Sequence, residues 1–258
     1  MSYIIAITGK GGVGKTTVSA IMISRMIARG CRPILAIDAD PNTNLDAALG
    51  IGVEKTIGGI REEAKEYANL GMASGIDKKR LLDLKIAESL VECRDYDLIA
   101  MGRSEGAGCY CYANNILKDA IQHLAFQYPY VMLDNEAGLE NLSRRVVQAV
   151  DLMIMVTDPS VRGMDTVRRL HGLTKEMGIV YHHLAVVVNR LRRNELPGYA
   201  DALIHSIGAG FVLALPEDEA IIQLSEEGIS LAELAPDNPV ALKIDGLLDQ
   251  TGLIGTGR

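Results

Sequence analysis

A short run near the start of the chain has the residue types and spacing of a phosphate-binding loop. Residues 9–16 read GKGGVGKT, which matches the Walker A pattern between a strand-like segment and a helical pattern that begins near Thr16. Glycines let consecutive backbone N–H groups point inward, and a helix N-terminus adds partial positive charge. We therefore expect Lys15 to contact the β- and γ-phosphates of a nucleotide and the Thr16 hydroxyl to ligate Mg²⁺.

A second lysine, Lys10, directly follows the first glycine of this run. Two roles fit a long cation at this position. Its side chain is either solvated in the loop, or it reaches across a two-fold axis to phosphates held by another subunit, as arginine fingers do in trans.

Carboxylates follow two later strand-like runs. Asp38 and Asp40 come at the end of the run 33–38, and Asp134 ends the run 130–134, four residues before Gly138. Asp134 fits a role in holding Mg²⁺ through water, and the Gly138 N–H fits a contact to the γ-phosphate in a segment that closes on it. Asp40 precedes Pro41, so turn formation is the alternative role for Asp40.

Two cysteines, Cys109 and Cys111, are separated by a single residue among glycines and tyrosines. Two thiolates cannot complete a tetrahedral metal site, but a two-fold dimer supplies four, which suits zinc or nickel. Buried structural cysteines, a redox pair and coincidence are the alternatives, and the setting outside an apolar run favours metal. The pair His182 and His183 is left out of the site, because such a pair is more often solvated or capping.

The arrangement of apolar runs predicts the elements that position these residues. Seven short runs read as buried strands: 3–8, 33–38, 97–101, 130–134, 152–156, 184–189 and 210–215. Their lack of polar alternation predicts a doubly wound α/β fold, with a mostly parallel sheet covered by helices on both faces. We expect one domain over residues 1–258, with a polar helical insertion at 55–86, and ligands at the carboxyl edge of the sheet.

Composition excludes several classes of protein. The 258 residues are 48% hydrophobic and 23% charged, which is typical of a globular chain, and the formal net charge is −7. That charge argues against a general nucleic-acid binder and against binding to an anionic membrane surface. Four cysteines without a secretion signal, and no apolar run near the ~20 residues of a membrane helix, predict a cytoplasmic protein.

The string KGGVGKTT at residues 10–17 resembles the deviant Walker A superfamily of MinD, ParA and nitrogenase iron protein. The resemblance implies a P-loop NTPase fold of the SIMIBI type and hydrolysis of ATP by a dimer in which Lys10 acts in trans. It implies that Lys15 and Asp40 are catalytic, with Asp40 orienting the attacking water and Asp38 nearer the Mg²⁺. The residues implied to contact the phosphates are Gly11, Gly12, Val13, Gly14, Lys15, Thr16 and Thr17. Those implied to contact adenine are Asn189, Pro216 and Asp218. Asn and Pro at strand ends are also ordinary turn residues, which is the alternative role for Asn189 and Pro216.

Within this superfamily, the sequence GCYC at 108–111, followed by Asn114 and Asn115, resembles the CooC-type nickel-insertion ATPases, which mature carbon monoxide dehydrogenase and, in close relatives, acetyl-CoA synthase. The resemblance runs from Ile4 to about Leu224. It implies an ATP-hydrolysing metallochaperone that forms a nucleotide- and metal-dependent homodimer, binds nickel or zinc at Cys109 and Cys111, and serves a nickel enzyme. The alternative is a ParA- or MinD-like positioning ATPase, although the chain lacks the membrane-targeting tail of MinD.

Overall fold

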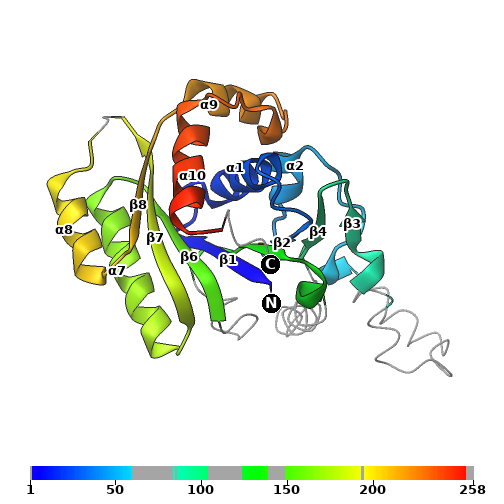
Figure 1. Cartoon of the computed structure of the whole chain (residues 1–258), viewed down its shortest axis with the longest axis horizontal. Coiled ribbons are helices and arrows are strands. Elements are labelled where there is room, and N and C mark those ends of the chain that lie inside the picture. The colour runs from blue at the N-terminus through cyan, green and yellow to red at the C-terminus, as the bar shows by residue number, and fades with distance from the viewer. Residues whose placement is uncertain are drawn as a thin grey trace.

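The computed structural model describes residues 2–59, 84, 86–103, 124–138, 149–192 and 195–253. In this part of the chain, eight strands form one sheet in the order β3-β4-β2-β5-β1-β6-β7-β8 (Figure 1). The strands are β1 (Tyr3–Gly9), β2 (Ile34–Asp38), β3 (Leu90–Glu92), β4 (Tyr96–Ala100), β5 (Tyr130–Asp134), β6 (Ala149–Thr157), β7 (Val180–Leu191) and β8 (Phe211–Pro216).

The order of the strands brings distant parts of the chain to one edge. Every neighbouring pair is parallel except β3 with β4. Strand β5 lies between β1 and β2, and its last residue, Asp134, is level with Ile7 of β1 and Asp38 of β2. The carboxyl ends of these three strands therefore converge, and in open parallel sheets this edge is where ligands bind.

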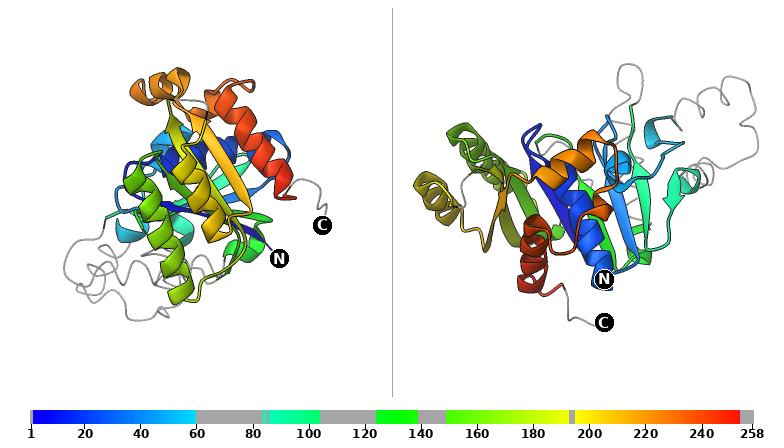
Figure 2. Two further views of the ribbon diagram at one scale, coloured as in Figure 1. Left: turned by 90° about the vertical axis from the view of Figure 1, so that its left-hand side faces the viewer. Right: turned by 90° about the horizontal axis from the view of Figure 1, so that it is seen from above.

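Helices cover both faces of the sheet (Figure 2). One face carries α7 (Val161–Glu176) and α8 (Gly198–Ile207), and the other carries α1 (Lys15–Ala28) and α10 (Pro239–Gln250), with α2 (Leu45–Leu49) and α9 (Glu219–Glu226) beside them. Two short 3-10 helices are η1 (Ala125–Gln127) and η2 (Leu231–Glu233).

Two hydrophobic cores follow from this layering. Ala6 of β1 packs in the core under α7 with Met164, while Ile5 and Ile7 pack in the core under α1 with Ile21. Because successive strand residues point to opposite faces and both faces are covered, the strands carry apolar side chains without alternation. The predicted doubly wound fold is confirmed.

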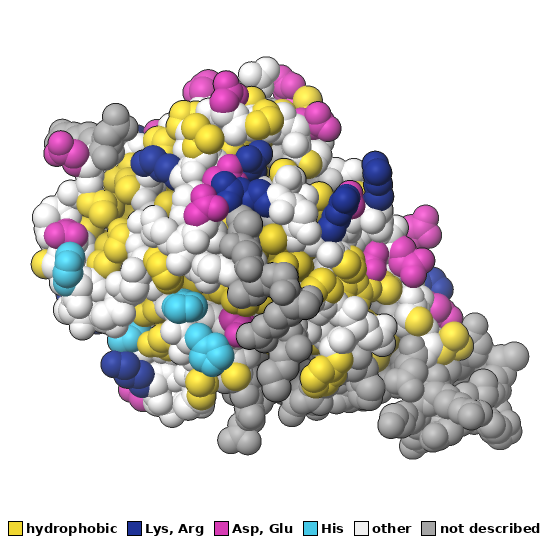
Figure 3. Space-filling view, in the orientation of Figure 1, with side chains coloured by type: hydrophobic (Ala, Val, Ile, Leu, Met, Phe, Trp, Pro, Cys, Tyr) yellow, Lys and Arg dark blue, Asp and Glu magenta, His cyan; other side chains and the backbone are white. Residues whose placement is uncertain are grey.

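The helix pair α1 and α10 is also joined by charged side chains. Arg25 Nη2 lies 2.6 Å from Asp245 Oδ2, and Arg29 Nε lies 3.0 Å from Asp245 Oδ1. In the space-filling view, basic and acidic side chains lie interspersed over this side of the molecule (Figure 3). Among the described residues, no helix has both the length and the apolar character needed to cross a bilayer.

All seven predicted strands are present, and β6 and β7 extend beyond their predicted limits. The short edge strand β3 was not predicted, because its three residues carry no run of buried apolar side chains. The first helix begins at Lys15, one residue before its predicted start. The predicted helical insertion at 55–86 lies mostly outside the described residues.

Candidate nucleotide site at the carboxyl edge of the sheet

The phosphate loop, residues 9–16, joins the end of β1 to the start of α1. Gly12 and Gly14 have φ angles of 78° and 91°, in the left-handed region that a side chain disfavours. A Cβ on Gly9 would lie 2.2 Å from the Val156 carbonyl oxygen, so only glycine lets the loop leave the sheet this close to β6. Gly14 at the N-cap of α1 has no side chain to cap the helix, so the N–H groups of the first turn remain open to an anion.

Lys15 is held inside the site rather than on its surface. Its side chain is buried and its Nζ donates to the Lys10 carbonyl oxygen at 3.3 Å. Burial lowers the pKa of Lys15, and the carboxylates of Asp134, Asp40 and Glu136 oppose that shift. A buried cation next to the N-terminus of a helix is well placed to bind phosphate oxygens. The side chain of Lys10 itself is exposed.

Asp38, at the end of β2, organises the loop that follows it. Its Oδ1 accepts from the Asp40 N–H at 3.0 Å, and its Oδ2 accepts from the N–H groups of Asn44 and Leu45, both at 2.9 Å. Burial raises the pKa of Asp38, and these three hydrogen bonds oppose the shift. The carboxylate therefore fixes the path of residues 40–45.

Asp40 is half-buried and forms the turn expected of an Asp before Pro. Its Oδ1 accepts from the Asn42 N–H at 2.9 Å. The Asn42 side chain in turn accepts a hydrogen bond from Arg103 Nη2 at 2.6 Å, which ties this turn to the chain just beyond β4. Asp40 thus lies at the predicted edge of the sheet.

Asp134, at the end of β5, differs from Asp38 although the two residues are neighbours in the sheet. It is 1% exposed, and its Oδ1 is buried without a hydrogen-bond partner. Burial, with a contribution from Asp38, raises the pKa of Asp134 to about 7, while Thr16, Ser19 and Lys15 oppose the shift. A buried, unpaired carboxylate oxygen beside the hydroxyl of Thr16 fits the oxygen-rich surroundings that Mg²⁺ prefers.

The segment after β5 is tied back to β1. The Gly138 N–H donates to the Gly9 carbonyl at 3.0 Å, and the Thr8 hydroxyl donates to the Gly138 carbonyl. The Asn135 N–H and Nδ2 both donate to the Ile7 carbonyl, at 3.1 and 2.9 Å. The Gly138 N–H is therefore next to the phosphate loop but engaged with it, so a contact from this N–H to a phosphate requires that bond to open.

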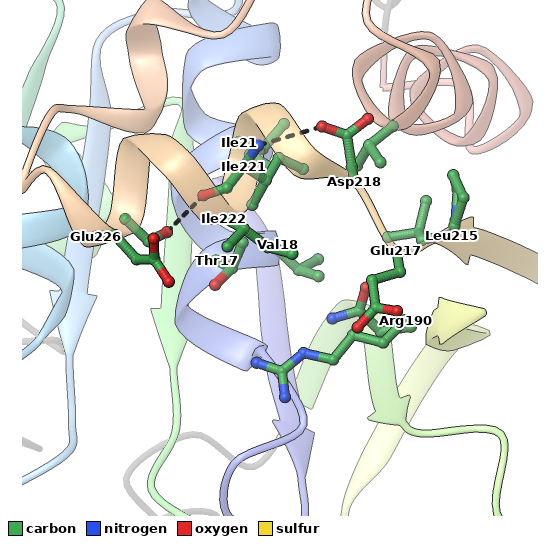
Figure 4. Close-up of a pocket in the computed structure, with 14 residues that line it drawn as sticks. Thr17, Val18, Ile21, Arg190, Leu215, Glu217, Asp218, Ile221, Ile222 and Glu226 are labelled. Carbon is green, nitrogen blue, oxygen red and sulfur yellow. Dashed lines mark hydrogen bonds between the residues drawn. The ribbon is translucent and has the colours of Figure 1, made fainter. Parts of the chain in front are cut away.

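A pocket of about 310 Å³ lies beyond the phosphate loop, between α1, α9 and the ends of β7 and β8 (Figure 4). Its lining combines apolar side chains such as Val18, Ile21 and Ile222 with the predicted adenine residues Asn189 and Pro216. This size and this mixture of apolar walls with a few polar groups are typical of a small-ligand site.

The predicted adenine residues carry structural hydrogen bonds as well. Asn189 Nδ2 donates to the Val13 carbonyl at 2.9 Å. Asp218 caps α9 by accepting from the Ile221 N–H at 3.1 Å, and its other oxygen accepts from Asn238 Nδ2 at 3.0 Å. Both Asp218 oxygens therefore accept hydrogen bonds within the protein, and the neighbouring Glu217 of this loop also lines the pocket.

The predicted metal-binding cysteines, Cys109 and Cys111, lie outside the described residues. The described cysteines, Cys31 and Cys93, are free thiols, buried and half-buried respectively. Within the described ranges, His, Cys, Asp and Glu side chains form no group of three that would hold a metal ion.

Sequence reasoning missed Arg190 and Asn135. Arg190 Nη1 donates to the Gly12 carbonyl at 3.0 Å, although the two residues are 178 positions apart. Asn135 is 2% exposed, and its Oδ1, like Oδ1 of Asp134, is buried without a hydrogen-bond partner. Neither residue belongs to the recognised motif, and the only available signal was that each sits at the carboxyl end of a predicted strand.

Comparisons with known proteins agree with this geometry. A family model described as an AAA domain matches residues 1–183. An uncharacterised ATP-binding protein of Methanocaldococcus jannaschii is 41% identical over 248 residues, covering 96% of this chain and 97% of that protein. The carbon monoxide dehydrogenase accessory protein CooC of Rhodospirillum rubrum is 29% identical over 253 residues, covering 90% of each chain.

The fold also matches solved structures. A ParA family ATPase from Chlorobium tepidum superposes with a TM-score of 0.71 at 21% identity, covering 97% of each chain. The strand order, the phosphate loop after β1 and this agreement over nearly the whole length all indicate the same P-loop fold. The chain belongs to the AAA-domain family of P-loop ATPases and has the MinD/ParA-type fold.

Proposed function

We propose that this protein hydrolyses MgATP as a two-fold dimer and uses the cycle to insert nickel into carbon monoxide dehydrogenase or acetyl-CoA synthase. The observation that carries the ATPase part is the unpaired, buried oxygen of Asp134 next to an open phosphate loop and the buried Lys15. The cargo part is supported by the relative named as a carbon monoxide dehydrogenase accessory protein and by the spacing of Cys109 and Cys111.

Each group of residues in the site has a separate role in phosphate transfer. The N–H groups of residues 11–17 and the Lys15 ammonium neutralise phosphate oxygens. Thr16 and Asp134 would hold Mg²⁺, which when bound neutralises charge that develops on those oxygens. Asp40 orients the attacking water, and its turn is held in place by the hydrogen bonds of Asp38 and Asn42.

The base occupies the pocket between α1 and α9 in this proposal. Its apolar walls exclude water, and the Asn189 side chain and the backbone at Pro216 supply polar contacts. One N–H of the Asn189 side-chain amide donates to the Val13 carbonyl, and the amide oxygen is an acceptor for a base amino group.

Dimerisation places Lys10 in the partner's site. The exposure of the Lys10 side chain, in contrast with buried Lys15, is consistent with a cation that acts outside its own subunit. Two copies of the segment that contains Cys109 and Cys111 then supply four thiolates to one nickel ion, which is the cargo of the reaction.

A second candidate is a nucleotide-switched positioning or partition ATPase. It is favoured by the MinD/ParA-type fold, including the agreement with a ParA family ATPase. Such a switch has no use for a pair of cysteines at Cys-x-Cys spacing, so metal binding separates the two functions.

The separating experiment measures nickel binding by anaerobically purified wild-type protein and by a Cys109→Ser, Cys111→Ser double variant, with and without ATP. The metallochaperone predicts one nickel per dimer in the wild type and none in the double variant. A Cys31→Ser, Cys93→Ser double variant is the matched control and should bind nickel as the wild type does. Equal nickel binding by wild type and the Cys109, Cys111 variant would favour the positioning ATPase.

A further inference from the structure

Two consecutive residues at the end of β7 hold two consecutive carbonyl groups of the phosphate loop. Asn189 Nδ2 donates to the Val13 carbonyl at 2.9 Å, and Arg190 Nη1 donates to the Gly12 carbonyl at 3.0 Å. Figure 4 shows Arg190 extending from the end of β7 toward the loop that precedes α1. We call these two hydrogen bonds the carbonyl clamp.

The local backbone is shaped so that both side chains reach the same loop. In a regular strand, neighbouring side chains point to opposite faces of the sheet. Here the pairing of β7 with β8 shifts register between Val188 and Leu191, and Arg190 has a φ of 59°, in the left-handed region that a long side chain rarely adopts. The irregular backbone aims both side chains at the phosphate loop, and a residue held in such a conformation outside glycine is a marker of a functional constraint.

The loop is in turn shaped to receive the clamp. A Cβ on Gly14 would lie 2.4 Å from Asn189 Nδ2, so a side chain at this position would displace the amide. The glycine at position 14 is thus required for the clamp as well as for its own φ of 91°.

The clamp has a direct consequence for the N–H groups that face the phosphates. The Gly12 carbonyl belongs to the same planar peptide as the Val13 N–H, and the Val13 carbonyl to the same peptide as the Gly14 N–H. In a trans peptide the C=O and N–H point in opposite directions, so fixing the two carbonyls outward fixes the two N–H groups inward.

We infer that Arg190 and Asn189 pre-orient the Val13 and Gly14 N–H groups for phosphate binding, and that Arg190 is a positioning residue for the ATPase. This inference rests on the proposed nucleotide binding. It assigns Arg190, which also lines the base pocket, to the phosphate loop rather than to the base.

The first test follows amide hydrogen exchange of Val13 and Gly14 by NMR in nucleotide-free protein. Arg190→Ala should exchange faster at both amides, roughly tenfold, and Arg190→Lys should recover part of the protection. Arg192→Ala is the matched control, because Arg192 is an exposed arginine two residues away whose Nε lies 3.4 Å from Glu217. Unchanged exchange in Arg190→Ala would overturn the clamp. This readout needs no ATPase activity, so it separates failure of the clamp from failure of the proposed function.

The second test compares the dissociation constants of ATP and inorganic tripolyphosphate, which has no base. The clamp predicts that Arg190→Ala weakens both ligands by the same factor, roughly tenfold, and raises KM more than it lowers kcat. Arg190→Gly, which suits the left-handed φ, should fold at least as stably as wild type and still lose the same affinity. If ATP binding weakens while tripolyphosphate binding does not change, Arg190 contacts the base side directly and the inference is wrong.

Discussion

The carboxyl ends of β2 and β5 carry two aspartates that are level in the sheet but differ in their surroundings. Asp38 and Asp134 are each 1% exposed, and burial raises the pKa of both. The oxygens of Asp38 accept three backbone N–H groups, whereas Asp134 Oδ1 has no partner.

The difference in hydrogen bonding indicates different roles: Asp38 holds the loop in place, whereas Asp134 has an oxygen that is free of protein hydrogen bonds. Leaving a buried polar atom unpaired costs stability, so such an atom is a sign of a ligand that completes it. Both oxygens of Asp38 accept hydrogen bonds from the loop that carries Asp40, while Asp134 has an unpaired oxygen, which holds Mg²⁺ in the proposed function. Between two buried carboxylates in one site, the hydrogen bonds decide the role more clearly than position in the motif does.

The largest effect is expected from Lys15→Ala, which removes the buried cation that acts on Asp134. ATP hydrolysis should fall by about 100- to 1,000-fold, because the variant lacks a preorganised charge for the phosphates. Phosphate release by single-turnover assay measures the loss, and the exposed Lys243→Ala serves as a control for lysine removal. Hydrolysis within a few-fold of wild type would contradict the role of Lys15.

Asp134→Asn should lower hydrolysis by about 10- to 100-fold, because a partner of the metal is lost. The same change should stabilise nucleotide-free protein at pH 8 by a few kcal/mol, since each unit of pKa shift corresponds to about 1.4 kcal/mol.

The sign of this effect follows from linkage. A carboxyl whose folded pKa is raised from 3.8 to about 7 costs no stability below pH 3.8, and the cost grows as the pH rises to about 7. The gain from Asp134→Asn should therefore be present at pH 8 and nearly absent at pH 4. Urea denaturation at both pH values, in EDTA, checks this, and equal gains at the two pH values would contradict it.

Asp38→Asn should lower the free energy of unfolding, whereas Asp134→Asn should raise it at pH 8. An asparagine supplies one oxygen and places an NH₂ group against backbone N–H donors, so the nucleotide-free protein should lose roughly 2 kcal/mol. Urea denaturation of this variant beside Asp134→Asn measures both signs in one series. If both variants are stabilised at pH 8, the comparison between the two aspartates is wrong.

The smallest effect is expected from Arg103→Ala, which removes the hydrogen bond to Asn42 at the turn of Asp40. Both side chains are exposed, so the loss of stability should stay within about 1 kcal/mol. Hydrolysis should fall a few-fold as the Asp40 turn loosens, while Arg94→Ala, another exposed arginine near β4, should leave it unchanged. A fall as large as that of Asp134→Asn would mean that Arg103 has a more direct role.

The sequence was sufficient for the features that depend on local pattern. Apolar runs without alternation predicted the buried parallel sheet, and the glycine spacing at residues 9–16 predicted the loop before α1. Both arise from residues close together in the chain. Strand β3 was not predicted, because its three residues are too few to form a recognisable apolar pattern.

Features that depend on contacts between distant segments could not be predicted. The Arg190 contact with Gly12 requires the bulge in β7 and the place of β7 two strands from β1. The contrast between Asp38 and Asp134 depends on where the N–H groups of Asn44 and Leu45 lie, and the motif around Asp38 does not encode that.

The most direct test of the central claim is phosphate release from ATP by the wild-type protein as a function of Mg²⁺, measured in parallel with Asp134→Asn. The account predicts that wild-type release rises with Mg²⁺ to saturation, while the variant shows a rate about 10- to 100-fold lower and requires more Mg²⁺. Hydrolysis that does not respond to Mg²⁺, or that is equal in the two proteins, would contradict the assignment of the buried Asp134 oxygen to the metal.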